Sequence, residues 1–370
     1  MAGWRLPVTS PHPLSWYRMA CGGRVLRKDA LLVFLVLLVA GLLMERFGGD
    51  DTLLRWLGKA AGQQVEYVPV SGASARSAEV AHTAPLLNQV DVAAIPGPGQ
   101  PVRFLMHNVQ NYFVAGEAYR SRYVLKPKSM ESREAVAEVI AAAKPQIVGL
   151  IEMGGPVALQ DLRQRLSARG LEYPYYRVLP RQGEDRALAL LSVHPIVQDH
   201  SQETVKLHRQ KRRKMLRGIL DVTIRLADGR LYRIVGAHLK SRVSDNAGAT
   251  DSLRKQEAYT LAQHIQHISR SQKGMPLLVF GDWNDGPADA APQILQQGLS
   301  QDAALRRLSP EDSRGEEWTL YYKRGKEYCL YDQIFVNPVL RDRMRGQGGI
   351  IDIPAAARAS DHRALWCDLR

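Results

Sequence analysis

Cysteine is scarce in this sequence. The 370 residues contain three, Cys21, Cys329 and Cys367, and none of them forms a Cys-x-x-Cys pair. A structural zinc cluster needs closely spaced cysteines or histidines, so the sequence argues against one. The His-Glu-x-x-His motif of zinc hydrolases is also absent. A disulfide between Cys329 and Cys367 stays open, because the sequence does not place the two sulfurs.

Acidic residues are outnumbered, with 37 Asp and Glu against 50 Lys and Arg, a formal net charge of +13 and a pI of about 9.7. This excess favours anionic partners, namely nucleic acid, phosphate esters or an anionic membrane surface. A basic surface that serves only solubility is the alternative. Hydrophobic content of 45% and charged content of 24% are close to globular averages, so the chain can bury a sizeable core.

One uncharged apolar run, Ala30–Met44, follows a basic segment over residues 1–29. As a helix this run rises about 22 Å against a bilayer core of about 30 Å, and extension to Phe47 brings it closer to a span. We expect a transmembrane signal anchor over 30–47, with a cleaved signal peptide or a buried soluble helix as alternatives. Basic residues favour the cytoplasmic side, so 1–29 would stay inside. Residues 48–100, rich in Gly, Pro and small residues, predict a flexible linker.

From residue 101 onward, apolar runs alternate with helical patterns. The Asp228-Gly229 dipeptide between two β-rich runs predicts a hairpin over Gly218–Leu239. The other expected strands are Val102–Val109, Gln146–Met153, Ala187–Ile196, and the runs "PLLVFGDWN", "YDQIFVN" and "DHRALWCDL". Helices are expected in the back half of the segment ending at Lys144-Pro145, in "VALQDLRQRLSARG" and over Asp251–Arg270. The alternation predicts a layered α/β (α+β) fold with sheets inside and helices outside.

Polar residues collect where these expected strands end. They are Asn108, Glu152, His238, Asp282, Asn284, Asp332, Asp361 and His362. Rigid strands aim side chains at a common mouth, and carboxylate and carboxamide oxygens suit a hard divalent ion such as Mg²⁺. Imidazoles suit proton transfer or the stabilisation of a phosphoryl oxygen. Each residue alone also fits a turn or a cap, so it is their joint occurrence that indicates an active site.

The stretch Leu278–Gly286, "LVFGDWNDG", carries the densest group of such residues. Alternation along a strand predicts that Asp282 and Asn284 point to the same side and Trp283 to the other, into packing. We expect Asp285 to form an Asx turn rather than to serve as a ligand.

Seven short motifs occur along the chain in this order: "HNVQNYF", "IVGLIEM", "ALLSVHPI", "GAHLKS", "VFGDWND", "YDQIFV" and "SDHRAL". In this order residues 101–370 resemble the endonuclease/exonuclease/phosphatase superfamily, which includes pancreatic-type deoxyribonuclease, apurinic-site endonucleases, neutral sphingomyelinases and inositol polyphosphate 5-phosphatases. The resemblance implies a four-layer α/β/β/α sandwich, with two mixed β-sheets packed face to face. One departure is "LSVHPI", where His194 stands in place of the usual Arg-Tyr.

The resemblance also implies roles for the strand-end residues. Glu152, helped by Asn108 and Asp361, would bind the metal, which is Mg²⁺ with Mn²⁺ or Ca²⁺ as alternatives. The catalytic residues implied are His238, Asp282, Asn284, Asp332 and His362.

Each catalytic residue has an implied task. Asp282 would orient or deprotonate the attacking water, and Asn284 would hold a phosphoryl oxygen. His362, paired with Asp332, would act as a base or stabilise the pentacovalent phosphorus. His238 would stabilise the phosphoryl group or assist the leaving oxygen.

Basic residues near these motifs suggest a phosphate-containing substrate. Lys240, Arg242 and Arg186 are candidates for phosphate contacts, and the run Arg209–Arg217 could follow a nucleic-acid backbone or hold anionic lipid. The stretch "YYKRGKEYCLY" suits base stacking, or plain cross-strand packing in a hairpin.

We therefore expect a Mg²⁺-dependent phosphodiesterase that acts as an endonuclease on DNA or RNA. The alternatives are a phospholipid or sphingomyelin phosphodiesterase, another phosphatase at the membrane, or an inactive module that binds nucleic acid or membrane. The expected location is the bacterial inner membrane, with the catalytic domain in the periplasm, or secretion if the anchor is cleaved. No protein partner is inferred.

Overall fold

The computed structural model describes residues 100–115, 126–181, 184–208, 212–242, 247–323, 325–346 and 348–369. Apart from residue 100, the basic segment, the anchor and the linker expected over 1–100 lie outside these residues. The described ranges contain no helix with the length and apolar character needed to cross a membrane.

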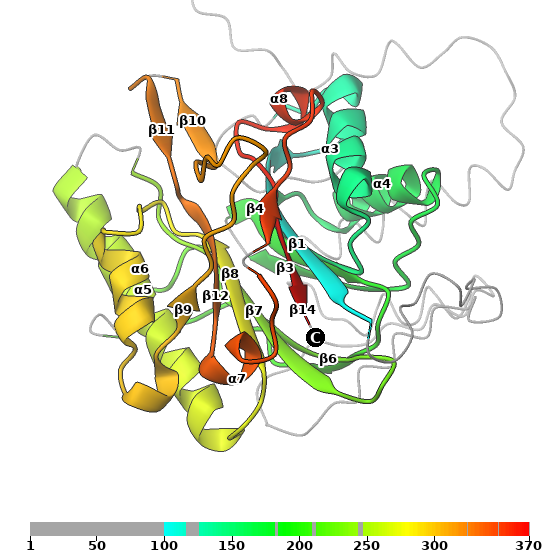
Figure 1. Ribbon diagram of the computed structural model, residues 1–370. Coiled ribbons are helices and arrows are strands. Elements are labelled where there is room, and N and C mark those ends of the chain that lie inside the picture. The colour runs from blue at the N-terminus through cyan, green and yellow to red at the C-terminus, as the bar shows by residue number, and fades with distance from the viewer. Residues whose placement is uncertain are drawn as a thin grey trace, which may run out of the picture. The chain divides into compact units, whose positions relative to one another are not determined.

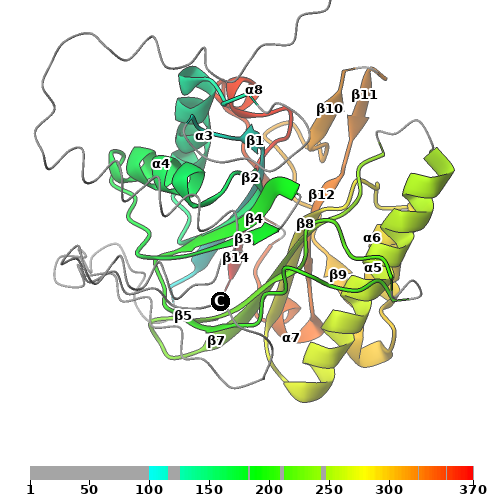
Figure 2. The ribbon, with the colours of Figure 1, turned by 180° about the vertical axis from the view of Figure 1, so that it is seen from behind.

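Two mixed six-stranded sheets form the centre of the fold (Figures 1 and 2). Sheet A has the order β13 (Gly349–Ile350), β14 (Leu365–Leu369), β1 (Val102–Tyr112), β2 (Ile147–Met153), β4 (Glu184–Ser192) and β3 (Tyr175–Arg181). Sheet B has the order β5 (Ile196–Asp199), β6 (Leu220–Arg225), β7 (Leu231–His238), β8 (Leu277–Asp282), β12 (Asp332–Val336) and β9 (Arg306–Arg307). The pairs β1–β2 and β7–β8 are parallel, and the other neighbours are antiparallel.

Helices cover the outer face of each sheet. Sheet A packs against α3 (Met130–Ala143), α4 (Pro156–Ser167) and α8 (Ala356–Ala359). Sheet B packs against α5 (Ala247–Ser271), α6 (Ala290–Gln297) and the short helix η3 (Gln301–Ala303). The inner faces share one apolar core, to which α7 (Pro338–Arg341) adds Leu340. This arrangement confirms the expected α/β layers, with sheets inside and helices outside.

Phe280 on β8 shows how tightly the two sheets meet. Its ring lies 5.3 Å from the ring of Phe104 on β1. A Cβ added to Gly149 on β2 or to Gly236 on β7 would come within 2.6 Å of the Phe280 ring. These glycines therefore leave the space that the ring fills, and a larger residue at either position would displace the ring.

Several sequence expectations are confirmed. β6 and β7 form the predicted antiparallel hairpin. The stretch "YYKRGKEYCLY" forms the hairpin β10 (Leu320–Tyr322) and β11 (Glu327–Cys329). Cys329 and Cys367 are both free thiols, so the disulfide left open by the sequence is not formed.

The strand expected over Ala187–Ile196 is confirmed as far as Ser192, where β4 ends, and its continuation to Ile196 is wrong. The chain leaves sheet A after Ser192 and enters sheet B at Ile196. The Ser192 hydroxyl accepts a hydrogen bond from the backbone N–H of His194 at 2.9 Å, and Pro195 follows. A local side-chain bond of this kind, followed by proline, favours a turn over a continuing ladder.

Candidate active site

Strand alternation brings polar side chains to one edge of the sandwich. On β8, Leu278 and Phe280 point into the inner core, so Asp282 continues on the same side. β7 is parallel to β8 and places His238 opposite Asp282. β12 is antiparallel to β8 and places Asp332 opposite the same residue. Each of these residues is the terminal residue of its strand, directly beyond the core.

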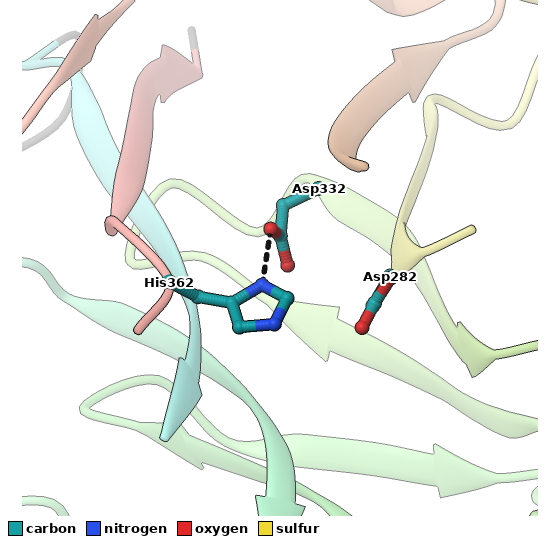
Figure 3. Close-up of side chains that lie close together, drawn as sticks. All are labelled: Asp282, Asp332 and His362. Atoms are coloured by element: carbon teal, nitrogen blue, oxygen red, sulfur yellow. Dashed lines mark hydrogen bonds and ion pairs between the residues drawn. The ribbon is translucent and has the colours of Figure 1, made fainter. Parts of the chain in front are cut away.

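His362 reaches this edge from the loop that precedes β14. Its Nδ1 lies 2.6 Å from Asp332 Oδ2, so the expected pairing is present (Figure 3). The Ser360 hydroxyl fixes the loop, because it accepts from the His362 backbone N–H at 3.1 Å and donates to the Asn108 carbonyl at 2.8 Å. Burial works against a charged imidazole, but the Asp332 carboxylate outweighs burial and raises the pKa of His362 to about 10. The ring is therefore an imidazolium at neutral pH.

Asp282 lies across from this pair (Figure 3). Asn108 Nδ2 donates to Asp282 Oδ2 at 3.0 Å, and the Asn284 backbone N–H donates to Oδ1 at 2.9 Å. Burial first, and then the nearby Asp332 carboxylate, raise the pKa of Asp282 to about 7. A carboxyl group with such a pKa can accept and release a proton near neutral pH.

His238 stands between two carboxylates. Its Nε2 lies 3.5 Å from Asp282 Oδ2 and 3.9 Å from Glu152 Oε1. Burial and the positive charge of Arg217 lower the pKa of His238 well below its usual range, so the ring is neutral. Within the described residues its buried Nδ1 has no hydrogen-bond partner. The surroundings of the two imidazoles therefore leave His362 positively charged and His238 neutral.

Glu152 takes an unusual backbone conformation, with φ of 61° at a non-glycine position. Its Oε2 accepts from the Asn111 backbone N–H at 3.1 Å and lies 3.6 Å from Arg186 Nε. Gln110 and Asn111 also have positive φ, at 46° and 53°. Strained backbone of this kind tends to collect at functional sites, and here it gathers at the ends of β1 and β2.

Lys128 was not anticipated from the sequence. Its ammonium donates to the Gln110 carbonyl at 3.2 Å. Burial lowers the pKa of Lys128, while Asp361 and Glu152 act on it in the opposite direction. This effect places Lys128 near both carboxylates. No motif marks the residue, because it lies in the irregular segment before α3.

Asn284 departs from the expected geometry. β8 ends at Asp282, and Asn284 has a left-handed φ of 51°. The expectation that Asp282 and Asn284 share one side through strand alternation is therefore wrong. Asn284 Nδ2 donates to the Leu239 carbonyl at 3.1 Å, while its backbone N–H holds Asp282.

Asp285 is a buried ion-pair partner and does not form the expected turn. Its Oδ1 accepts from Arg254 Nε at 2.6 Å and from Arg242 Nη2 at 2.9 Å. The turn is held instead by Asp289, whose carboxylate accepts from the Gly286 backbone N–H at 2.8 Å.

The candidate phosphate-binding cations occupy different places. Arg186 lies beside Glu152, at the site. The guanidinium of Arg242 also donates to the Asn284 carbonyl and pairs with Asp289, so its contacts lead to the segment after β8. Lys240 Nζ donates to the Ser241 carbonyl at 3.2 Å. Of the cation run Arg209–Arg217, residues 209–211 lie outside the described residues.

The donor set fits a hard divalent cation. Asp282, Asp332 and His362 each present one ligand atom, and these atoms lie within 4.8 Å of one another. Asp332 Oδ1 is buried and has no hydrogen-bond partner in the described part of the chain. Carboxylate oxygens suit Mg²⁺ or a similar hard ion. The expected ligands Asn108, Glu152 and Asp361 adjoin this group: Asn108 bonds Asp282, Glu152 adjoins His238, and Asp361 Oδ1 lies 4.0 Å from His362 Nε2.

Comparison with known proteins identifies a sequence family and solved structures of similar fold. A sequence model of the Endonuclease/Exonuclease/phosphatase family matches residues 108–362. The human Nocturnin catalytic domain, solved with a bound sulfate anion, has 19% identity and a TM-score of 0.51, covering 73% of this chain and 94% of that one. An endonuclease/exonuclease/phosphatase from Bacteroides vulgatus has 17% identity and a TM-score of 0.54, and one from Leptotrichia buccalis C-1013-b has 17% and 0.53; each covers 73% of this chain and 99% of its own. No curated protein sequence matches the chain.

Proposed function

Since the chain belongs to the endonuclease/exonuclease/phosphatase family, we propose that it is a divalent-metal-dependent phosphodiesterase that cleaves nucleic acid. The observation that carries this proposal is the His362–Asp332 pair facing Asp282 across the edge of the sandwich. The net charge of +13 supports a polyanionic substrate. The lipid phosphodiesterase alternative is an outcome of the test below.

The protonation states of the site residues suggest a role for each of them. Asp282, with its pKa raised to about 7, takes the proton of the attacking water. The His362 imidazolium, kept charged by Asp332, donates to the phosphoryl oxygen on which negative charge grows. The Asn108 amide and the Asn284 backbone N–H hold Asp282 in place. The water oxygen forms a bond to phosphorus as the bond to the leaving oxygen breaks, and neutral His238, beside Asp282, donates a hydrogen bond to that leaving oxygen.

A bound divalent ion would supply charge stabilisation at the phosphoryl oxygens. We propose that Glu152 holds it, with Asn108 and Asp361, because Glu152 and Asp361 are partly exposed while Asp332 is committed to His362. Arg186, beside Glu152, is the best placed of the expected cations to contact a substrate phosphate.

The test is to incubate the full chain with supercoiled plasmid DNA, single-stranded RNA and sphingomyelin vesicles, with Mg²⁺ and then with EDTA. We expect Mg²⁺-dependent cleavage of nucleic acid and a loss of about 10²- to 10⁴-fold in Asp282→Asn. Asp302→Asn, an exposed aspartate on η3, is the matched control and should keep full activity. Sphingomyelin turnover without cleavage of nucleic acid would contradict the proposed substrate. Wild-type activity in the Asp282→Asn variant would contradict the proposed active site.

Membrane attachment is a separate proposal that rests on the sequence. The apolar run Ala30–Met44 and the cations before it support an anchor with the catalytic part outside the cytoplasm. Release of the full chain from membranes by salt or by carbonate would contradict it.

A further inference from the structure

An aromatic cluster projects beside the active site on the hairpin β10–β11. Tyr321 and Tyr328 are direct cross-strand partners, and their ring centroids lie 4.9 Å apart. The Trp318 ring also lies against Tyr328, with the ring centroids 4.9 Å apart and the ring planes tilted by 56°. The opposite face of the hairpin turns inward, because the cross-strand pair Leu320 and Cys329 is buried. The hairpin thus presents one aromatic face outward; we call Trp318, Tyr321 and Tyr328 the aromatic platform.

Cross-strand packing does not account for the whole platform. Such packing would be satisfied by rings that cover one another, yet Tyr328 remains 66% exposed, among the most exposed large side chains of the described residues. Lys323 and Lys326 are exposed at the hairpin tip. The Arg363 guanidinium lies 4.2 Å from the centre of the Trp318 ring, on the same cluster. Flat aromatic rings among cations are the elements with which proteins hold unpaired bases of single-stranded nucleic acid.

The platform is fastened to the catalytic residues. Leu320 bridges to His362, and the Arg363 backbone N–H donates to the Thr319 carbonyl at 2.7 Å. The Thr319 hydroxyl in turn accepts from the Asp332 backbone N–H at 3.1 Å. In both views the hairpin extends from the N-terminal end of β12, whose first residue is Asp332 (Figures 1 and 2). A base resting on Tyr328 would therefore belong to a nucleotide close to the phosphate that is cleaved.

We infer that the aromatic platform stacks a nucleobase of a single-stranded substrate next to the scissile phosphate, with Tyr328 as the contacting ring. The inference rests on the proposed function and names the form of its substrate. A duplex hides its base faces in its own stack, so the platform selects strands whose bases are unpaired. The described tip residues Lys323, Gly325 and Lys326 include no aliphatic side chain, so the tip offers nothing that would insert into the apolar interior of a bilayer.

The test compares two oligomers of the same length and charge on the full chain. One is oligothymidylate, and the other has tetrahydrofuran abasic residues throughout. Binding is measured by fluorescence anisotropy in EDTA, and cleavage is then measured with Mg²⁺. For Tyr328→Ala we expect about tenfold weaker binding and about tenfold higher KM on oligothymidylate, with no change on the abasic oligomer. Tyr328→Phe should restore both values.

Tyr176→Ala is the matched control. Tyr176 on β3 is 46% exposed and has Arg163 4.3 Å from its ring centre, so it is an exposed tyrosine beside a cation that lies outside the platform. This variant should bind and cleave both oligomers as the wild type does, and unchanged melting temperatures exclude a folding defect.

The outcomes separate the two proposals. Equal binding of both oligomers by the wild type, or an equal loss on both in Tyr328→Ala, overturns the platform as a base-stacking site. So does a Tyr328→Ala defect confined to vesicles of phosphatidylcholine and phosphatidylglycerol. Base-dependent binding through Tyr328 without any cleavage supports the platform and contradicts the proposed function.

Discussion

Among the described residues, two aspartates of sheet B are hydrogen-bonded to a histidine, one on each face of the sheet. On the inner face Asp332 Oδ2 lies 2.6 Å from His362 Nδ1. On the outer face, against α5, Asp221 Oδ2 lies 2.7 Å from His264 Nε2. The bond lengths and the burial of both aspartates are nearly the same, so neither feature distinguishes a catalytic pair from a structural one.

The two aspartates differ in their other hydrogen-bond and ion-pair partners. Arg233 pairs with both carboxylate oxygens of Asp221, at 2.7 Å through Nη2 and by a shorter bond through Nε. Burial opposes the charge of Asp221, but His264 and Arg233 outweigh it and lower the pKa of that carboxyl. Asp332 Oδ1 has no hydrogen-bond partner among the described residues, and Asp282 faces the pair. A carboxylate whose oxygens are all bonded stabilises the fold, while one left partly unbonded at a strand end is available for chemistry.

The largest expected effect is on activity. Asp332→Asn removes the charge that keeps His362 protonated, so kcat should fall about 10³-fold. The variant should stay folded, since the amide keeps the shape and most contacts of the side chain. Steady-state kinetics with thermal melting of the same samples checks both statements. Full activity in this variant would contradict the proposal that the Asp332–His362 pair is catalytic and the Asp221–His264 pair structural.

The second expected effect is on stability. Asp221→Asn leaves the Arg233 guanidinium buried without its counter-charge, which should lower the free energy of unfolding by about 3 kcal/mol. Urea titration followed by fluorescence measures the loss, and Asp302→Asn is the control with no expected change. The kcat of the folded Asp221→Asn protein should equal that of the wild type. A 10³-fold loss there would show that the outer pair also serves catalysis.

The pH dependence of stability should further distinguish the Asp221–His264 pair from the Asp332–His362 pair. The pKa of Asp221 is lowered from its ordinary value of 3.8 by folding. Its contribution to stability is therefore fully present above about pH 4 and is lost as the pH falls through the lowered value. The difference in unfolding free energy between wild type and Asp221→Asn should shrink between pH 6 and pH 3. A difference that grows on acidification would contradict the assignment.

The smallest expected effect concerns the metal. Mg²⁺ at ten times its dissociation constant should raise the free energy of unfolding by about 1.4 kcal/mol. Thermal melting with Mg²⁺ and with EDTA should show this shift in the wild type, in Asp221→Asn and in the exposed control Glu131→Gln, and not in Glu152→Gln. If Glu152→Gln keeps the shift while Asp282→Asn loses it, the ion binds among Asp282, Asp332 and His362 instead.

Much of the fold follows from local patterns. Strand alternation and the Asp228-Gly229 turn predict most strands of both sheets, and helical spacing predicts α3, α4 and α5. The sequence did not predict β3, whose run contains Pro180 and charged residues, or the break after Ser192. Such segments carry no periodic signal of their own, because their conformation depends on neighbours supplied by distant parts of the chain.

The site divides in the same way. The sequence predicts Asp282, His238 and Asp332 because each stands at one end of an apolar strand, and the structure places His238 and Asp332 on either side of Asp282. Lys128 was missed because an irregular segment brings it to Glu152 and Asp361. Arg242 was expected to meet phosphate, yet its neighbours are Asp285 and Asp289. Which cation meets which carboxylate depends on contacts between residues far apart in the chain.

The sequence by itself determined that His238, Asp282 and Asp332 stand at strand ends, since period-two alternation and apolar runs are local properties of the chain. Only the tertiary structure decided that both carboxylate oxygens of Asp221 are hydrogen-bonded, while Asp332 Oδ1 has no hydrogen-bond partner among the described residues. It surrounds Asp221 with Arg233 and His264, and it brings His362 from the loop before β14 to Asp332. The physical reason is that the state of a buried charge is set by the groups that face it across the fold, and sequence spacing does not specify those groups.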